Sequence, residues 1–346
     1  MALKASSGTI SAKAKCMYGK RLTAENYNDM LRKRTVTELA AYLKENTYYS
    51  SALQHIDTNS IHRGQLENIL HRELFNRYTK LCRYNFGDTG EFYDYLVYRM
   101  EIEQLLRCIM SLNAHTMDQF IIELPAFLIQ HASFDLLALA KARDMEDLLE
   151  IVLHTLYYQI LREFVPAHDE LVDYTACEKA LMSYHYHHIL SVVSKKFRGN
   201  TKKDLEKVIK INVTLTNITM MYRLKTFFQA DRDTVKNSIY DYNYRITQNR
   251  LNEFLDTESP EDFLAVFKNS YYGKAVDGVE FTYFENYAAR IKNQFNKKLM
   301  RFSTSPPAVL YAYIALNLIE IDNITSIIEG IRYQVSPSQI QKLLVI

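Results

Sequence analysis

The feature of this sequence that most constrains its fold is an internal repeat of about 110 residues, which occurs three times. Each copy contains an apolar stretch that begins with an acidic residue and ends in a tyrosine pair. The pairs are Tyr48 and Tyr49, Tyr157 and Tyr158, and Tyr271 and Tyr272. A second landmark, an aliphatic residue followed by an acid or Thr, an amide and another aliphatic residue, lies at 102–105, 215–218 and 321–324. The repeat predicts three similar domains, at residues 1–115, 116–229 and 230–346.

The interior of each copy has the same predicted order of elements. Short helices come first, and a turn then separates two long helical patterns, at residues 85–90, 198–200 and 303–307. Each copy is therefore expected to form a group of short helices followed by a long helical hairpin.

Composition and periodicity favour an all-α fold. Nine glycines and six prolines are too few for the many turns of a barrel, a sandwich or a doubly wound sheet. Apolar side chains recur three and four residues apart from Leu66 to Tyr78, as on one face of a helix. Helix starts are predicted where a hydroxyl residue precedes an acid or amide by three positions, at Thr35, Ser259 and Ser336.

No membrane span or secreted context is expected from the residues. The long apolar run after Pro306 and Pro307 continues for about 12 residues, short of the roughly 20 that a spanning helix needs. The first residues lack the pattern of a signal peptide, and the four cysteines show no paired framework. We expect a reducing, cytoplasmic setting.

The sequence shows no catalytic motif. A phosphate-binding loop is missing, and Cys108 and Cys177 lack the surroundings of a nucleophile and are expected to fill helix cores. The acid pairs Glu101 with Glu103 and Glu320 with Asp322 occupy equivalent positions of two copies, and the middle copy lacks the acid. This pattern favours a structural role. A net charge of +2 gives no reason to expect nucleic acid.

A histidine cluster raises an alternative of another class, a helical metalloenzyme. His185 and His188 would lie on one face of a helix, with Cys177 or Glu178 as distant further ligands. A structural zinc site needs four ligands, so packing between helices is the favoured interpretation, and we expect no metal and no cofactor.

The densest basic stretch spans the second predicted turn. A solvated turn is the simpler interpretation, and a docking patch for an acidic protein surface is the functional one. The candidate partner-binding residues are Lys195, Lys196, Arg198, Lys202 and Lys203, with Lys207 and Lys210 continuing the run.

Residues 319–346 combine an acid, an asparagine, an aliphatic helix, a basic-glycine turn and a final helix that begins with Ser-Pro, and residues 18–49 have a basic start. In these two segments, and more weakly over essentially the whole sequence, the chain resembles the C subunit of bacterial and archaeal V-type (A-type) ATPases, which is similar to the d subunit of the eukaryotic V-ATPase. Two departures are Thr216, where the pattern has an acid, and the 26 tyrosines. The C-terminal positions that carry the resemblance are Asp322, Asn323, Ile324, Ile327, Ile328, Gly330, Arg332, Tyr333, Ser336, Pro337, Ile340 and Leu343.

The resemblance implies a funnel of three similar helical domains around a pseudo-three-fold axis. It implies a non-catalytic part of the central stalk, the rotor, that links the central shaft to the membrane proteolipid ring during ATP-driven ion transport or ATP synthesis. Such a protein would be peripheral on the cytoplasmic face of the membrane, with protein partners, no nucleic acid and no small-molecule substrate. The alternative is a helical scaffold unrelated to rotary ATPases, although solenoid repeats are typically shorter, about 34 to 47 residues.

Overall fold

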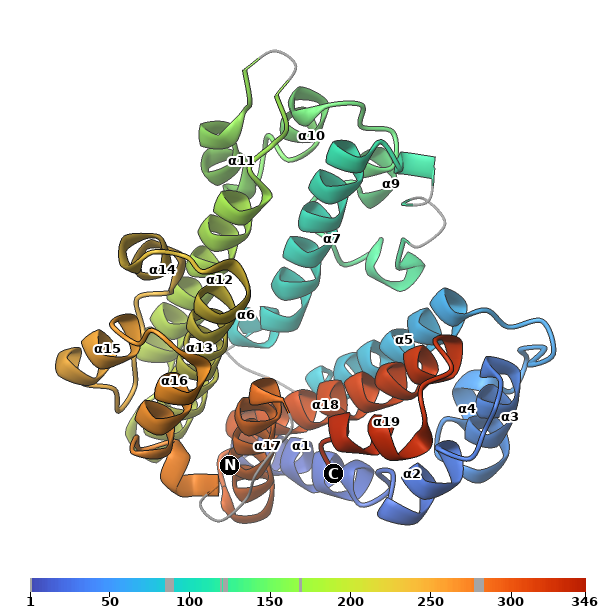
Figure 1. Ribbon diagram of the computed structural model, residues 1–346. Coiled ribbons are helices and arrows are strands. Elements are labelled where there is room, and N and C mark those ends of the chain that lie inside the picture. The colour runs from blue at the N-terminus through green and yellow to red at the C-terminus, as the bar shows by residue number, and fades with distance from the viewer. Residues whose placement is uncertain (1, 85–89, 119, 121–123, 168–169, 277–282) are drawn as a thin grey trace. The chain divides into compact units, whose positions relative to one another are not determined.

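The computed structural model describes residues 2–84, 90–118, 120, 124–167, 170–276 and 283–346. Every regular element in these ranges is a helix, which confirms the all-α prediction (Figure 1). The first predicted turn, at 85–90, lies outside the described residues except for Gly90.

The helices pack into two compact units. Unit 1 combines Met1–Gly87 with Arg198–Ile346, and unit 2 is Asp88–Phe197. Both boundaries fall at predicted hairpin turns. The units group helices by their packing, whereas the three predicted domains group residues by repeat, so the three-domain division stays a prediction.

Unit 1 contains the short helices of the first and third copies and most of the long helices. Its elements are α1 (Ala2–Tyr18), α2 (Ala24–Met30), α3 (Val36–Asn46), α4 (Ser50–Leu53), α5 (Arg63–Cys82), α13 (Gly199–Phe228), α14 (Arg232–Ser238), α15 (Gln248–Leu255), α16 (Pro260–Lys268), the 3-10 helix η3 (Gly273–Val276), α17 (Phe284–Phe302), α18 (Pro306–Arg332) and α19 (Pro337–Leu343).

Unit 2 contains the short helices of the middle copy between two long ones. Its elements are α6 (Gly90–Tyr93), α7 (Tyr95–Ala114), η1 (Ala126–Leu128), α9 (Leu136–Leu139), α10 (Met145–Ile151), α11 (Leu156–Leu161), η2 (Arg162–Phe164) and α12 (Tyr174–Lys196).

Helix α18 is the central helix of unit 1. It packs along α17, α1, α5 and α13, and its buried residues include Val309, Ile314 and Ile324. Pro306 and Pro307 lie in its first turn, where proline is well tolerated, so they begin this helix instead of interrupting one. Among the described residues, α18 is the helix that is long and apolar enough to cross a membrane, but 61% of its most apolar window is buried inside the protein. That burial is typical of a core helix.

The long helices pair in one recurring way. In unit 2, α7 packs on α12, and in unit 1, α13 packs on α17 and α18 packs on α5. In terms of the repeat, the second long helix of each copy packs on the first long helix of the next copy. The third copy returns to the first in the same manner, because α18 lies against α5 (Figure 1).

Side-chain caps begin several helices where the sequence predicted them. The hydroxyl of Thr35 accepts a hydrogen bond from the backbone N–H of Glu38 at 3.1 Å, and that of Ser259 accepts from Asp262 at 3.0 Å. The prediction for Ser336 was right about the start of α19 and about the pairing with Gln339, but the backbone part of the cap does not form. Its hydroxyl bonds to the side chain of Gln339 at 2.9 Å and makes no bond to the first-turn backbone.

Candidate functional site

A buried carboxylate on α18 joins the two ends of the chain. Glu320 is 7% exposed. Its Oε2 accepts a hydrogen bond from the backbone N–H of Leu22 at 2.8 Å, and its Oε1 accepts one from the hydroxyl of Tyr49 at 3.2 Å. The hydroxyl of Tyr48 donates a further, short hydrogen bond to Oε1. The three hydrogen bonds thus compensate for the free-energy cost of burying the Glu320 carboxylate.

Local structure at the end of α3 places the two tyrosines. The hydroxyl of Thr47 accepts from the backbone N–H of Tyr49 at 3.2 Å, and the rings of Tyr48 and Tyr49 stack with centroids 4.2 Å apart. The guanidinium of Arg77 lies 3.7 Å from the centre of the Tyr48 ring and pairs with Glu73 at 2.7 Å. Burial raises the pKa of Glu320, and its three hydrogen bonds and Arg77 oppose that rise.

Unit 2 holds an equivalent carboxylate on α7. Glu101 is 0% exposed, and its Oε2 accepts from the hydroxyl of Tyr157 at 2.7 Å. The backbone N–H of Ser133 donates a short hydrogen bond to Oε1. Thr155 accepts from the N–H of Tyr157 at 3.2 Å, as Thr47 does for Tyr49. Burial raises the pKa of Glu101 while the bonds from Tyr157 and Ser133 lower it.

In the middle copy of the repeat, Thr214 on α13 takes the place that Glu101 and Glu320 have in the other two copies. Its hydroxyl oxygen accepts from the backbone N–H of Tyr244 at 2.7 Å. The hydroxyl of Tyr272 bonds to the carbonyl of Tyr244 at 2.7 Å, and Ser270 accepts from the N–H of Tyr272 at 3.2 Å. We call each of these arrangements a junction. A junction consists of a buried side chain on a long helix, a backbone N–H, and a tyrosine two residues after a Ser or Thr.

The junctions correct the alignment of the tyrosine pairs. The sequence placed Tyr158 opposite Tyr49 and Tyr272, but the side chain in that place is Tyr157. The usable signal was the hydroxyl residue two positions earlier: Thr47, Thr155 and Ser270. The structural interpretation of Glu101 and Glu320 is confirmed, because each is a buried acceptor that holds segments together. Their predicted companions lie outside the junctions: Glu103 pairs with Arg99 at 3.0 Å and Asp322 is exposed.

Amide side chains of the second repeat landmark form a further contact. The amide of Asn323 accepts from the N–H of Val345 at 2.8 Å and donates to its carbonyl at 2.9 Å. Asn217 holds both backbone groups of Tyr240 at the same two distances. Each amide thus fixes an extended segment against a long helix, and the tail after α19 is the segment held by Asn323.

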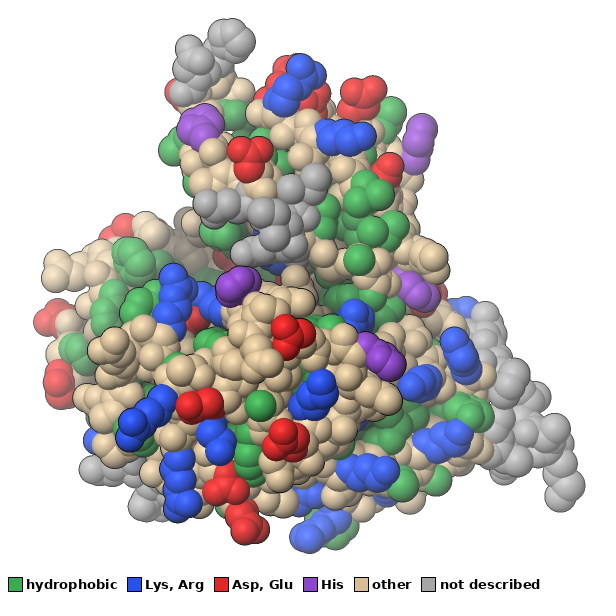
Figure 2. Space-filling model, turned by 90° about the vertical axis from the view of Figure 1, so that its right-hand side faces the viewer, with side chains coloured by type: hydrophobic (Ala, Val, Ile, Leu, Met, Phe, Trp, Pro, Cys, Tyr) green, Lys and Arg blue, Asp and Glu red, His purple; other side chains and the backbone are tan. Residues whose placement is uncertain are grey.

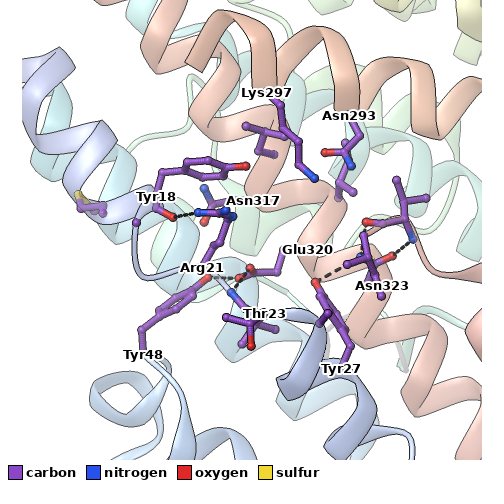
Figure 3. Close-up of a pocket in the computed structure, with 18 of the residues that line it drawn as sticks. Tyr18, Arg21, Thr23, Tyr27, Tyr48, Asn293, Lys297, Asn317, Glu320 and Asn323 are labelled. Atoms are coloured by element: carbon purple, nitrogen blue, oxygen red, sulfur yellow. Dashed lines mark hydrogen bonds between the residues drawn. The ribbon is translucent and has the colours of Figure 1, made fainter. Parts of the chain in front are cut away.

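A cavity of about 420 Å³ lies beside Glu320 within unit 1 (Figure 3). Its walls come from the segment between α1 and α2, from α17 and from α18. Polar side chains that line it include Tyr18, Arg21, Asn293, Lys297 and Asn317.

The predicted docking residues lie at the end of α12 and the start of α13. Lys195 and Lys196 are in the last turn of α12, in unit 2. Arg198 precedes the first turn of α13 in unit 1, and Lys202 pairs with Glu206 at 3.7 Å. Lys195, Arg198 and Lys203 are exposed. On the face shown in Figure 2, Lys and Arg side chains occur together with Asp and Glu. The docking role of the five residues stays a prediction.

The histidine cluster is part of the packing of unit 2. Burial, with smaller contributions from Arg99 and His188, lowers the pKa of His185 to about 3, so its imidazole is neutral. The ring of His188 stacks on Tyr184 at 5.7 Å and meets Tyr98 edge-on at 5.4 Å. Within the described ranges, no group of three His, Cys, Asp or Glu side chains is placed to hold a metal ion.

The two cysteines considered as nucleophiles are core residues. Burial raises the pKa of Cys108 to about 12 and that of Cys177 to about 11, so neither is a thiolate near neutral pH.

Comparison with known proteins gives one family over nearly the whole chain. Residues 10–343 match the family described as ATP synthase (C/AC39) subunit. The C subunit of the A-type ATP synthase of Methanosphaera stadtmanae is 23% identical over 271 residues, which cover 77% of this chain and 66% of that protein. The C subunit of the A-type ATP synthase of Desulfurococcus sp. strain SY is 22% identical over 216 residues, covering 62% of this chain and 56% of that protein. The matches thus span just under two thirds, and just over half, of the lengths of these relatives.

Proposed function

Because the chain belongs to the ATP synthase (C/AC39) subunit family, we propose that it is a non-catalytic central-stalk subunit of a V-type or A-type ATPase. In this role it couples the central shaft to the membrane proteolipid ring, during ATP-driven ion transport or ATP synthesis. The observation that carries the proposal is the family match over residues 10–343. The protein would then be held at the cytoplasmic face of the membrane through protein contacts.

The pairing of the long helices supports a coupling role. A rotor part must pass on torque without yielding, and close-packed helices provide that stiffness. In this chain the second long helix of one copy packs on the first long helix of the next, as α13 does on α17 and α18 does on α5. A torque applied to one copy is therefore transmitted to the next through packed side chains as well as through the connecting loop.

The Glu320 junction adds stiffness at the point where the third copy returns to the first. It ties α18 to Leu22 and Tyr49, which are 298 and 271 residues away in the sequence. A hydrogen bond to a charged acceptor contributes about 1.5–3 kcal/mol, more than a typical neutral one. The segment that leads into α2 is therefore held to the core helix by specific bonds as well as by packing.

The pseudo-three-fold funnel is part of the proposal. The recurring helix pairs and the three junctions, at Glu101, Thr214 and Glu320, are what related domains around an axis would produce. A tapered arrangement of related domains would suit a part that meets a narrow shaft at one end and a wide ring at the other.

The basic residues near the start of α13 are proposed as the contact to another protein of the complex. Lys195, Lys196, Arg198, Lys202 and Lys203 would face an acidic surface on that partner. Polar contacts of this kind favour specificity and a fast association rate over raw affinity, which suits a machine whose head can detach.

The test is to identify the proteins that copurify with a tagged copy from gently solubilised membranes. Shaft and ring proteins at comparable stoichiometry are the expected result. Their absence, with other cytosolic partners present, would refute the rotor assignment and favour the scaffold. The docking residues are tested by the double variant Lys195→Glu, Lys203→Glu, which should lose a partner that wild type retains. Its matched control is Lys141→Glu, Lys274→Glu, two exposed lysines elsewhere. Equal losses in the two double variants would remove the docking assignment alone.

A further inference from the structure

The cavity beside Glu320 has the size and the lining of a ligand site. Its volume of about 420 Å³ lies within the range of roughly 300–1,000 Å³ that small-molecule pockets occupy. Apolar residues such as Leu316 and Ile319 share its walls with polar side chains. A few polar groups that converge in a partly apolar hollow are the usual composition of a binding site.

Two cations approach this space from different walls. Arg21 comes from the segment before α2, and Lys297 comes from α17 (Figure 3). The Arg21 guanidinium lies 4.5 Å from the centre of the Tyr18 ring and donates to the Tyr18 carbonyl at 3.4 Å. Over the described part of the chain, the Lys297 ammonium has no hydrogen-bond or ion-pair partner. Burial, and then the nearby Arg21 and Arg290, lower the pKa of Lys297. An anion placed between Arg21 and Lys297 would relieve their mutual repulsion.

A buried amide faces the same space. Asn293 lies one turn before Lys297 on α17 and is 6% exposed. In the ranges that the structure describes, its side chain has no hydrogen-bond partner, and Figure 3 shows it at the cavity. Its amide atoms are open to the cavity and are not sealed in the core, so they are available to a polar ligand that enters it.

The charge of the lining favours an anion. The charged side chains around the cavity are Arg21, Arg77 and Lys297 against the carboxylate of Glu320, and the main-chain carboxylate of Ile346 lies in the same lining. That carboxylate is occupied by the donors of its junction, and Arg77 is paired with Glu73. Arg21 and Lys297 therefore remain to hold a ligand.

We propose that this cavity binds a small phosphate-bearing molecule, with the phosphate held by Lys297 and Arg21 and by the amide of Asn293. Arginine and lysine are the side chains that proteins use to bind phosphate. The bound molecule would bridge the segment before α2 and the helix α17, and so reinforce the closure of the third copy on the first. This inference goes beyond the rotor role and does not depend on it.

The experiment is calorimetric titration of the full chain with inorganic phosphate and with ADP, at constant ionic strength. Saturable binding at one site per chain is expected for at least one probe. ADP binding more tightly than phosphate would assign the site to a phosphate ester, and equal affinities would assign it to the free ion. The absence of saturable binding by either probe up to millimolar concentration would overturn the proposal.

Matched variants locate the binding. Lys297→Met should raise the dissociation constant at least tenfold, whereas Lys298→Met, at the next residue of α17 and outside the lining, should leave it within twofold. Arg21→Met tests the opposite wall and should also weaken binding at least tenfold. Both Arg21 and Lys297 are exposed at the cavity mouth, so these variants are expected to fold, which circular dichroism would verify. Equal weakening by Lys297→Met and Lys298→Met would contradict the assignment.

Discussion

Replacing Glu320 by leucine should destabilise unit 1 by about 3 kcal/mol or more. The change removes the acceptor of the Leu22 N–H and of the Tyr48 and Tyr49 hydroxyls. A buried donor left without an acceptor costs about 1–3 kcal/mol, so three donors give about 3–9 kcal/mol. Removing a buried carboxylate returns part of this cost, which places the expected net loss near the lower end.

Urea unfolding followed by circular dichroism would measure the loss, and hydrogen exchange would locate it. Because the chain has two compact units, peptides of unit 2 serve as an internal reference. Protection should fall at Leu22 and in the residues around Tyr49 and stay unchanged around Glu101. The matched control is Asp322→Asn, an exposed acid two residues further along α18, which should cost less than about 0.5 kcal/mol.

The reasoning would be refuted by a loss below about 1 kcal/mol, because a donor left unsatisfied by itself costs at least that much.

The ionisation of Glu320 also predicts a pH dependence of stability. Burial raises the pKa of Glu320 above its usual value of 4.5, so the folded state binds this proton more tightly than the unfolded state, and that contribution to stability is lost as pH rises through the raised value. Relative to Glu320→Gln, wild-type unit 1 should therefore lose stability between about pH 4.5 and that raised pKa.

Three further predictions concern other parts of the chain. The pKa of His185 is lowered from 6.5 to about 3, so unit 2 should lose up to about 1.4 kcal/mol per pH unit below pH 6.5. Urea unfolding at pH 5 and pH 7 would measure this change in unfolding free energy, and His185→Leu should abolish the part due to His185. The same change with pH in wild type and His185→Leu would contradict the prediction. Gly273→Ala should cost at least about 2 kcal/mol in thermal unfolding, because its Cβ would overlap the backbone of α16. At Gly8, inside α1, an added Cβ meets nothing within 4 Å, so Gly8→Ala should be neutral or slightly stabilising. Similar losses of melting temperature in the two variants would refute the steric argument. Asn323→Leu should raise hydrogen exchange at Val345, and unchanged protection there would show that the amide does not hold the tail.

Local signals in the sequence predicted the helices well. The apolar spacing from Leu66 to Tyr78 does lie on the buried face of α5. The caps at Thr35 and Ser259 were predictable because a cap involves residues only three positions apart. The repeat also placed Asn217 and Asn323 at equivalent positions, and in the structure both amides bind the backbone of an extended segment.

Contacts between distant segments could not be predicted in the same way. The bond from Leu22 to Glu320 spans 298 residues, and no local pattern specifies which of many buried groups will meet. The place of Tyr157 was missed for a related reason. Tyr157 and Tyr158 form a pair like those of the other two copies, so the pairs were aligned with each other. The Thr155 hydroxyl, which fixes the position of Tyr157, is a weaker signal in the sequence. The cavity residues Arg21 and Lys297 become neighbours only when α17 and α18 pack near the N-terminal helices.

The three junctions meet one geometric requirement with different chemistry. Glu101 and Glu320 each reach a backbone N–H and a tyrosine hydroxyl with one carboxylate. Thr214 has a shorter side chain with a single oxygen, which accepts the N–H of Tyr244, while the Tyr272 hydroxyl turns to the Tyr244 carbonyl. Because a neutral threonine satisfies the requirement without burying a charge, the acid itself is not what the position needs. What all three share is the fixing of an incoming chain segment to a long helix, and the proposed coupling role would depend on this property.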